Sequence, residues 1–330
     1  MKTSRTGTIF AFVFSALFVT AAFWLFFNRQ YAQDWISVQN FTPSAAIETI
    51  NERAKFTEKG RFIFYATNPQ VENQESFNKE CPRQEPGSPI LGCYTNDDRI
   101  FVYDITNKQL DGMEEVTAAH EMLHAAWHRA TEAERQSLTT QLRAAYQKLG
   151  DSELKTRMDY YERTEPGEFV NELHAILGTE VASLDPSLET YYSQYFNRDA
   201  VLKLHQQYKS VYDSLYARAD SLYTLMQTLS TSIQSRSSSY DAEVTQLSAD
   251  IASFNKRAGN GVFTSQAQFN AERAALVRRT AALEAERSAL NSDIVTYNTY
   301  YKEYDSISKQ IELLNSSTDS FKEIEQAPSV

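Results

Sequence analysis

Hydrophobic residues follow three different patterns along this chain of 330 residues. The first is an unbroken apolar run from Thr8 to Phe27, which contains no charged residue. The second is a pair of short segments, 61–67 and 100–105, that are rich in aromatic and β-branched residues. The third begins near Tyr208, where apolar residues recur at spacings close to three and four. Together they predict an apolar helix, a small mixed domain and long amphipathic helices.

The apolar run is long enough to cross a bilayer. At about 1.5 Å per residue, a helix over 8–27 covers the roughly 30 Å hydrocarbon core. Lys2 and Arg5 precede the run and Arg29 follows it, a slight bias that favours a cytoplasmic N-terminus. We therefore expect a cytoplasmic tip over 1–7, a single transmembrane anchor in the plasma membrane and an extracytoplasmic remainder.

A cleaved signal peptide is the competing interpretation of this run. Such a peptide has a shorter apolar region that ends in a small-x-small cleavage site. Here the run stays bulky from Phe23 to Phe27, and Trp24 stands where an interfacial aromatic residue would be placed. An uncleaved anchor is therefore favoured.

The region 28–200 is expected to form a mostly helical α+β domain with a short sheet. Segments 61–67 and 100–105 have the composition of β-strands. Thr131 and Glu134 form a capping-box pattern, so a helix is predicted to begin there.

A further acidic helix is predicted from about Glu165-Pro166, because proline is well tolerated in a first helical turn. Cys81 and Cys93, which are 12 residues apart, flank a proline-containing loop. Outside the cytoplasm these two cysteines are expected to form a disulfide bond.

Five consecutive residues, His120-Glu121-Met122-Leu123-His124, carry the candidate chemistry. On a helix, His120 and His124 lie on one face and can offer two imidazole nitrogens to one metal ion. Glu121 lies about 100° round the helix from His120, close enough to reach a water at an open metal position. Its carboxylate can then take a proton as that water attacks a carbonyl group.

This H-E-x-x-H arrangement resembles the zincins, a family of zinc peptidases, over about residues 60–180. The resemblance implies a Zn²⁺ ion held by His120 and His124, with Glu121 as general base. It also implies an edge strand beside the metal helix, where an extended peptide can pair. Segment 100–105 is either that strand or a core strand with no role in binding.

Catalytic zinc sites usually have three protein ligands, so a third is expected from the acidic helix. The chain is similar to the gluzincins, which supply a glutamate there. The pair Asn171-Glu172 indicates Glu172 as the ligand, whereas Glu168-x-x-x-Glu172 would make Glu168 the ligand. Glu172 is preferred because it borders the apolar face of the helix, and Glu180 and His174 are further alternatives.

The resemblance leaves two smaller points. The metzincin subgroup is excluded, because Trp127 and Ala130 stand where its additional glycine and histidine would be. Three residues are candidates to donate a hydrogen bond to a tetrahedral intermediate, and the sequence selects none of them: Tyr160, Tyr161 and His174.

Heptad spacing on both sides of Gly259-Asn260-Gly261 predicts an antiparallel coiled-coil hairpin over 201–315. The three turn residues tolerate positive φ. Ile294 and Tyr301 are expected to fill part of a second apolar row, and 316–330 is expected to be a flexible tail. The apolar positions of the second arm repeat every seven residues: Leu276, Leu283, Leu290, Tyr297, Tyr304 and Ile311.

Charge and pattern together narrow the function. The net charge is −11 and no basic patch stands out, so nucleic acid is not an expected partner. The sequence predicts a membrane-anchored, extracytoplasmic zinc peptidase that acts on a protein or peptide substrate. The hairpin leaves room for a protein partner or self-association. The alternative is a non-enzymatic envelope scaffold with a structural or degenerate metal site, but such a site has no use for Glu121 as a base.

Overall fold

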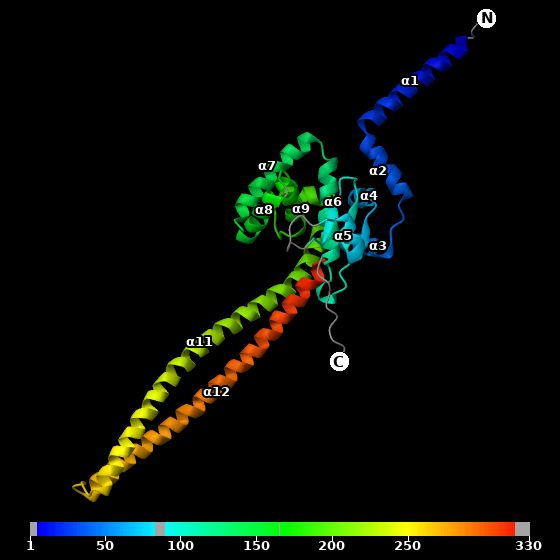
Figure 1. The fold of residues 1–330 in the computed structure, drawn as a ribbon. Coiled ribbons are helices and arrows are strands. Elements are labelled where there is room, and N and C mark those ends of the chain that lie inside the picture. Colours follow the sequence, from blue (N-terminus) through cyan, green and yellow to red (C-terminus); the bar gives the residue numbers. More distant parts are fainter. Residues whose placement is uncertain (1–4, 83–89, 165, 321–330) are drawn as a thin grey trace. The chain divides into compact units, whose positions relative to one another are not determined.

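The computed structural model describes residues 5–82, 90–164 and 166–320 (Figure 1). The chain forms two compact units. The first unit contains Met1–Val211 together with Leu314–Val330, and the second contains Tyr212–Leu313. The first unit holds the candidate chemistry and is called the metal domain below, and the second is called the hairpin.

Helices dominate the chain, and the fold agrees with the predicted mostly helical α+β class. The amino-terminal helices are α1 (Arg5–Phe27), α2 (Arg29–Asn40), α3 (Ala45–Ala54), α4 (Glu58–Ala66) and α5 (Gln74–Glu80). A 3₁₀ turn, η1 (Lys108–Leu110), precedes α6 (Met113–Arg129), α7 (Glu132–Leu149), α8 (Ser152–Thr164), α9 (Phe169–Thr179) and α10 (Pro186–Tyr192). Two long helices complete the chain: α11 (Arg198–Gly259) and α12 (Gln266–Thr318).

The strands form one small sheet in the order β1-β3-β2. Its members are β1 (Gln70–Glu72), β2 (Gly92–Tyr94) and β3 (Ile100–Tyr103). The central strand β3 pairs in parallel with β1 and antiparallel with β2. The predicted strand at 100–105 is therefore confirmed, but it is the buried centre of the sheet and not an edge.

Helix α6 lies at the centre of the metal domain, in contact with α3, α4, α9, β2 and β3. Its closest neighbour is α9. Gly178 of α9 permits this approach, because a Cβ atom there would lie 2.5 Å from a methyl group of Leu123. Leu123 is fully buried, so the two helices are held at a short separation by their packing.

The predicted strand at 61–67 is wrong, because these residues lie in helix α4 and its C-cap. The side chain of Thr57 caps the helix by accepting a hydrogen bond from the Gly60 amide. Gly60, Ile63, Phe64 and Thr67 are buried at spacings of three and one, which is a helical period. Burial of this face against the core decides the conformation against the β propensity of its aromatic residues.

The sequence predicts where two helices begin, and one of these two predictions is correct. The capping box at Thr131 and Glu134 is confirmed, with both hydrogen bonds present. The acidic helix does not begin at Glu165-Pro166: α9 begins at Phe169, and Glu165 lies outside the described residues. Gly167 has φ +99, a left-handed conformation that interrupts the helical path before α9.

The disulfide bond between Cys81 and Cys93 is confirmed. It connects the C-cap of α5 to the middle residue of β2. The intervening residues 83–89 lie outside the described part of the chain.

The hairpin contains two long helices that run in opposite directions. Three ion pairs show this, because the residue numbers increase along α11 while those of the partners on α12 decrease: Arg218 to Glu303, Arg236 to Glu286 and Arg257 to Glu272. The predicted turn is confirmed, since α11 ends at Gly259 and Gly261 has φ +67.

One part of the predicted seam is wrong. Ile294 and Tyr301 are 42% and 55% exposed, so they do not form the second row. Of the predicted tail 316–330, the last ten residues lie outside the described structure. Before them, α12 continues to Thr318, and the Ser320 carbonyl accepts a hydrogen bond of 2.6 Å from Asn78.

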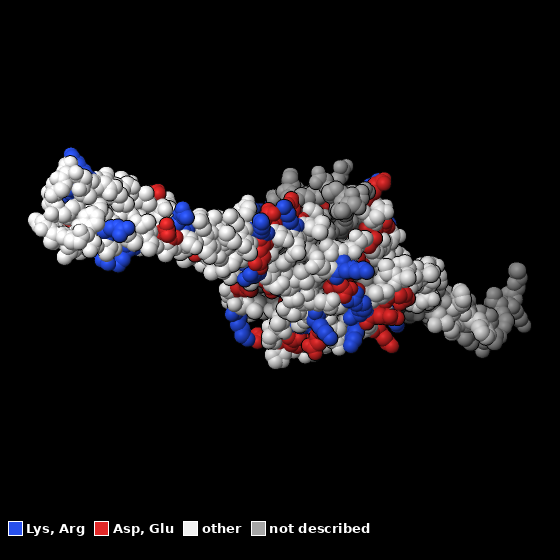
Figure 2. Space-filling model, turned by 90° about the horizontal axis from the view of Figure 1, so that it is seen from below, with Lys and Arg blue, Asp and Glu red and all other residues white. Residues whose placement is uncertain are grey.

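Helix α1 corresponds to the apolar run and carries no charge in its last turn. In Figure 2 the described part of α1 shows neither red nor blue. Among the described residues, no helix taken alone is long and apolar enough for a membrane span. Phe12–Phe27 and α2 pass that criterion only as a pair, which is bent by 85°.

Candidate metal centre

Helix α6 places the two histidines of the motif on one face. Glu114 and Glu115 in its first turn and Arg129 in its last turn complement the helix dipole. The rings of His120 and His124 lie one turn apart, with their centroids separated by 4.8 Å. His124 is buried, whereas His120 is half-buried.

Glu172, from α9, faces both histidines. Its Oε1 atom lies 3.3 Å from His124 Nε2, and its Oε2 atom lies 3.6 Å from His120 Nε2. The three candidate ligand atoms lie within 4.8 Å of one another. Two imidazoles and a carboxylate in this arrangement could hold a metal ion, and the donor set suits zinc with a fourth position left open.

A second layer of contacts fixes the orientation of His124. Its Nδ1 atom lies 2.9 Å from the side-chain oxygen of Asn171. The Asn171 amide nitrogen donates to Glu168 at 2.8 Å, so the oxygen is the group that faces His124. Because that oxygen can only accept, Nδ1 carries a proton, and Nε2 is the ring nitrogen left to bind a metal ion. This is the tautomer that a metal ligand requires.

Electrostatics keeps Glu172 ionised although it is buried. Burial alone would raise the pKa of its carboxyl group, but His124, His120 and Arg157 together lower that pKa from 4.5 to about 2. The group is therefore an anion over the whole physiological range, as a metal-binding carboxylate must be.

Glu121 lies beside this cluster in a different environment. Burial raises the pKa of its carboxyl group, and attraction to His124 and His120 opposes this only in part. The amide of Tyr94 donates a hydrogen bond to the carboxylate. A side chain at Gly92 could not be accommodated, since its Cβ atom would lie 2.9 Å from Glu121 Oε1. Strand β2 therefore lies directly against the carboxylate of Glu121.

Strand β2 is at the end of the sheet, and its unpaired edge lies near the Glu121 carboxylate. Tyr103 of β3 donates to the carbonyl of Leu91, so Leu91 and Cys93 direct their polar groups toward β3. Gly92 and Tyr94 consequently direct theirs to the opposite side, where Glu121 is found. The edge strand beside the metal helix is thus β2, a segment that the sequence did not identify.

The alternative ligands have other contacts. Glu180 forms a two-bond ion pair with Arg157, at 2.6 and 2.7 Å. Glu168 is exposed and holds Asn171. His174 is fully buried among the rings of Trp127, Tyr191 and Tyr192, and burial lowers its pKa to about 3. None of these three side chains belongs to the cluster of candidate ligand atoms found in the described residues.

Of the two tyrosine candidates, Tyr161 is coupled electrostatically to Glu172. Burial raises the pKa of its hydroxyl group, and the charge of Glu172 raises it further. Arg157 is hydrogen-bonded to Tyr161 and also lowers the pKa of Glu172. Tyr161 and Arg157 therefore form a polar flank beside Glu172.

The sequence predicts the three candidate ligands and Glu121, but it does not predict the residues that contact and orient them. In the sequence, Asn171 only helps to indicate Glu172 as a ligand. Its hydrogen bond to His124 Nδ1 depends on the packing of α9 against α6. Gly92 and Tyr94 carried no sequence signal, because a three-residue strand is too short for a recognisable pattern.

Comparison of this chain with protein-family models, with curated proteins and with solved structures finds no match. What the site can do therefore follows from its own geometry: a cluster of two histidines and a glutamate that could hold a metal ion, beside a buried carboxylate and the edge of a sheet.

Proposed function

We propose that this chain is a membrane-anchored zinc peptidase. The observation that carries the proposal is the convergence of His120, His124 and Glu172 within 4.8 Å. Glu121 follows His120 directly and lies in the same buried region, where a base would be needed. The Cys81–Cys93 disulfide supports an extracytoplasmic location for the domain.

Each residue of the centre has a distinct role in the proposed reaction. His120, His124 and Glu172 would hold Zn²⁺, which when bound polarises a carbonyl group and makes a water molecule more acidic. Glu121 accepts the proton of the attacking water and delivers it to the leaving amine. Its raised pKa makes the carboxylate a stronger base than an exposed glutamate. Tyr161 and Arg157, which flank Glu172, would donate hydrogen bonds to the negative charge that develops on the substrate.

Strand β2 is the proposed docking edge for the substrate. An extended peptide can add to the free side of β2 through backbone hydrogen bonds, which do not depend on the substrate sequence. Gly92 and Tyr94 of β2 lie beside the Glu121 carboxylate, so the scissile bond of a docked peptide would pass that carboxylate. The disulfide at Cys93 holds the strand in this position.

The deciding experiment compares Glu121→Gln with the unchanged protein, purified as the full chain. Glutamine keeps the size and the Tyr94 hydrogen bond but cannot accept the proton, so zinc stays bound while casein cleavage falls at least about 100-fold. Glu162→Gln, on the exposed surface of α8, is the matched control and should change neither quantity. Removal of zinc by a chelator should abolish cleavage, and added zinc should restore it.

The second candidate function is a non-enzymatic scaffold in which the hairpin is the working part. The observation that favours it is the set of ion pairs that joins α11 and α12 along their length, which suits a stiff spacer. On that proposal the two helices supercoil as a coiled coil and the metal only stabilises the domain. Zinc-loaded protein whose cleavage is absent, or equal in Glu121→Gln, would favour the scaffold.

A further inference from the structure

The chain turns sharply where the apolar helix ends (Figure 1). Only Asn28 separates α1 from α2, and the two helices are bent by 85°. The Asn28 side chain donates to the carbonyl of Trp24 at 2.9 Å, which ends α1 at the bend. If α1 crosses the bilayer near its normal, α2 therefore has to run close to the membrane plane.

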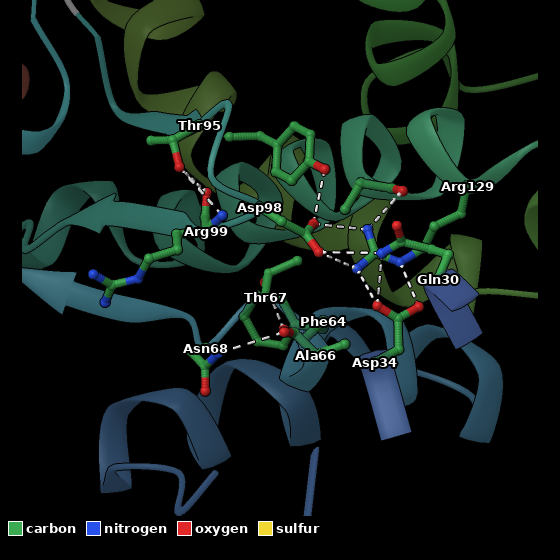
Figure 3. A network of polar contacts seen from close by, with 12 residues as sticks. Gln30, Asp34, Phe64, Ala66, Thr67, Asn68, Thr95, Asp98, Arg99 and Arg129 are labelled. Carbon is green, nitrogen blue, oxygen red and sulfur yellow. Dashed lines mark hydrogen bonds and ion pairs between the residues drawn. The ribbon is translucent and has the colours of Figure 1, made fainter. Parts of the chain in front are cut away.

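A buried ion-pair network fixes the rotation of α2. Asp34 is 4% exposed and receives two hydrogen bonds from Arg129, at 2.7 and 2.9 Å. Arg129 also binds Asp98, and Gln30 donates to Asp34 at 2.9 Å (Figure 3). Turning α2 about its axis would take the buried Asp34 carboxylate away from Arg129, and breaking a buried ion pair is strongly unfavourable.

The exposed side of α2 carries three large apolar side chains among polar ones. Tyr31, Trp35 and Ile36 are 53%, 52% and 55% exposed. The only acidic residue of α2 is the buried Asp34, so this face carries no negative charge. The Tyr31 ring contacts Trp24 of α1, with 6.4 Å between centroids, and it also stacks on Phe62 of α4 at 5.5 Å. An aromatic surface thus continues from the end of α1 onto α2.

We propose that α2 is an interfacial helix whose Tyr31, Trp35 and Ile36 face lies in the headgroup layer of the lipid bilayer. The proposal rests on the membrane anchoring by α1 that was proposed above. Tryptophan and tyrosine prefer this layer because their rings are apolar and their polar atoms remain in contact with water. The continuity with the exposed apolar surface of α1 selects lipid as the occupant of this face.

The network has a consequence for the metal centre. Arg129 is the last residue of α6, and His124 lies five residues earlier on the same helix, about 7.5 Å along the axis. Because Arg129 binds the inner face of α2, the carboxyl end of α6 becomes the membrane side of the domain. The centre would then lie near the membrane side of the domain.

The test uses the three tryptophans of the chain, Trp24, Trp35 and Trp127. Three full-length variants each retain one tryptophan, the other two being changed to phenylalanine. Each variant is inserted into phosphatidylcholine vesicles whose acyl chains carry bromine either near the headgroup or near the chain end. Unchanged zinc content of each variant would verify that the metal domain is folded.

We expect shallow bromine to quench Trp35 about twofold or more, and deep bromine to quench it less. Trp127, which packs on His174 inside the metal domain, is the internal control and should not be quenched by either lipid. Trp24 reports separately on the anchor and should be quenched.

Two results would overturn the inference. If Trp24 is quenched and Trp35 is not, the anchor stands but α2 does not lie in the interface. In that case, protection of Trp35 from acrylamide in the aqueous phase would show that another protein surface covers α2. If neither tryptophan is quenched, membrane anchoring fails as well.

Discussion

Charged side chains lie between packed helices in both units of this protein, yet they meet different surroundings. In the metal domain, Glu172 and Glu121 are 7% exposed, and burial and neighbouring charges shift their pKa values in opposite directions. In the hairpin, Arg236 and its partners Glu286 and Asp293 are 34%, 37% and 31% exposed. Water therefore screens the hairpin charges, whereas the metal domain uses burial to set different protonation states.

The hairpin charges have a regular spacing. Arg236, Glu243, Asp250 and Arg257 recur every seven residues on α11, and each pairs with a charge on α12. A slip of one heptad would bring Arg236 toward Arg279 and Glu243 toward a glutamate, Glu272. Since apolar heptads alone would tolerate that slip, we infer that the charges specify the register. Burial sets the protonation states of charged groups in one unit, and we infer that ion pairs set the alignment of the helices in the other.

Removal of a metal ligand should produce the largest effect and leave the hairpin unchanged. We expect Glu172→Ala to lose bound zinc, because two imidazoles alone do not complete the site. Glu168→Ala, on the same helix, is the matched control and should keep zinc. Metal stoichiometry of the two purified variants decides between them. Full zinc occupancy in Glu172→Ala with an empty site in Glu168→Ala would reverse the assignment.

Loss of the amide that orients His124 should have the next largest effect. Asn171→Ala removes the acceptor for Nδ1–H, so zinc affinity should fall about 10–100-fold without complete loss. Asn171→Asp keeps an acceptor oxygen at the same position and should bind zinc nearly as well as the unchanged protein. Competition titration with a chromogenic chelator measures both affinities, and equal values for all three proteins would contradict the role of Asn171.

A buried carboxyl group in the metal domain should make stability depend on pH. Burial raises the pKa of Glu114 from 4.5 to about 7. Because the unfolded chain ionises first, this group opposes folding progressively as pH rises from 4.5 to 7, and the penalty is constant above that. Glu114→Gln should therefore stabilise the domain by about 1–2 kcal/mol at pH 8, after allowance for solvent screening, and hardly at all at pH 4.

The matched change in the hairpin should have the opposite sign. Arg218 lowers the pKa of Glu303, so its ionised form stabilises the fold above pH 4.5 and this contribution is lost at lower pH. Glu303→Gln should therefore be slightly destabilising at pH 8. Denaturant unfolding of both variants at pH 4 and pH 8 makes the comparison. A stabilising effect of Glu303→Gln at pH 8 would show that the two units do not differ in this way.

The smallest expected effect concerns the register of the hairpin. Arg236→Glu places like charges beside Glu286 and Asp293, so hydrogen exchange in the 283–297 segment should accelerate about two- to fivefold. The double change Arg236→Glu with Glu286→Arg restores one opposite pair and should recover part of the protection. Equal exchange in the single and double variants would mean that these charges do not specify the register.

Features that depend on local spacing could be predicted from the sequence. The motif places His120 and His124 on one helical face because a helix repeats every 3.6 residues. The Thr131 capping box and the turn at Gly259-Asn260-Gly261 follow from short-range hydrogen bonding and backbone freedom. Glu172 is selected from four candidates because it lies at the edge of an apolar face, and the structure brings it to the two histidines.

Features that depend on neighbours distant in the sequence could not be predicted in this way. Packing against the core makes 61–67 helical although its composition favours a strand. The approach of α9 to α6 brings Asn171 to His124, and pairing with β3 gives Gly92–Tyr94 its place beside Glu121. Local patterns specify which conformations a segment prefers. Burial and the partners of polar groups are set only when the segments meet, because those free energies belong to the contact and not to either segment alone.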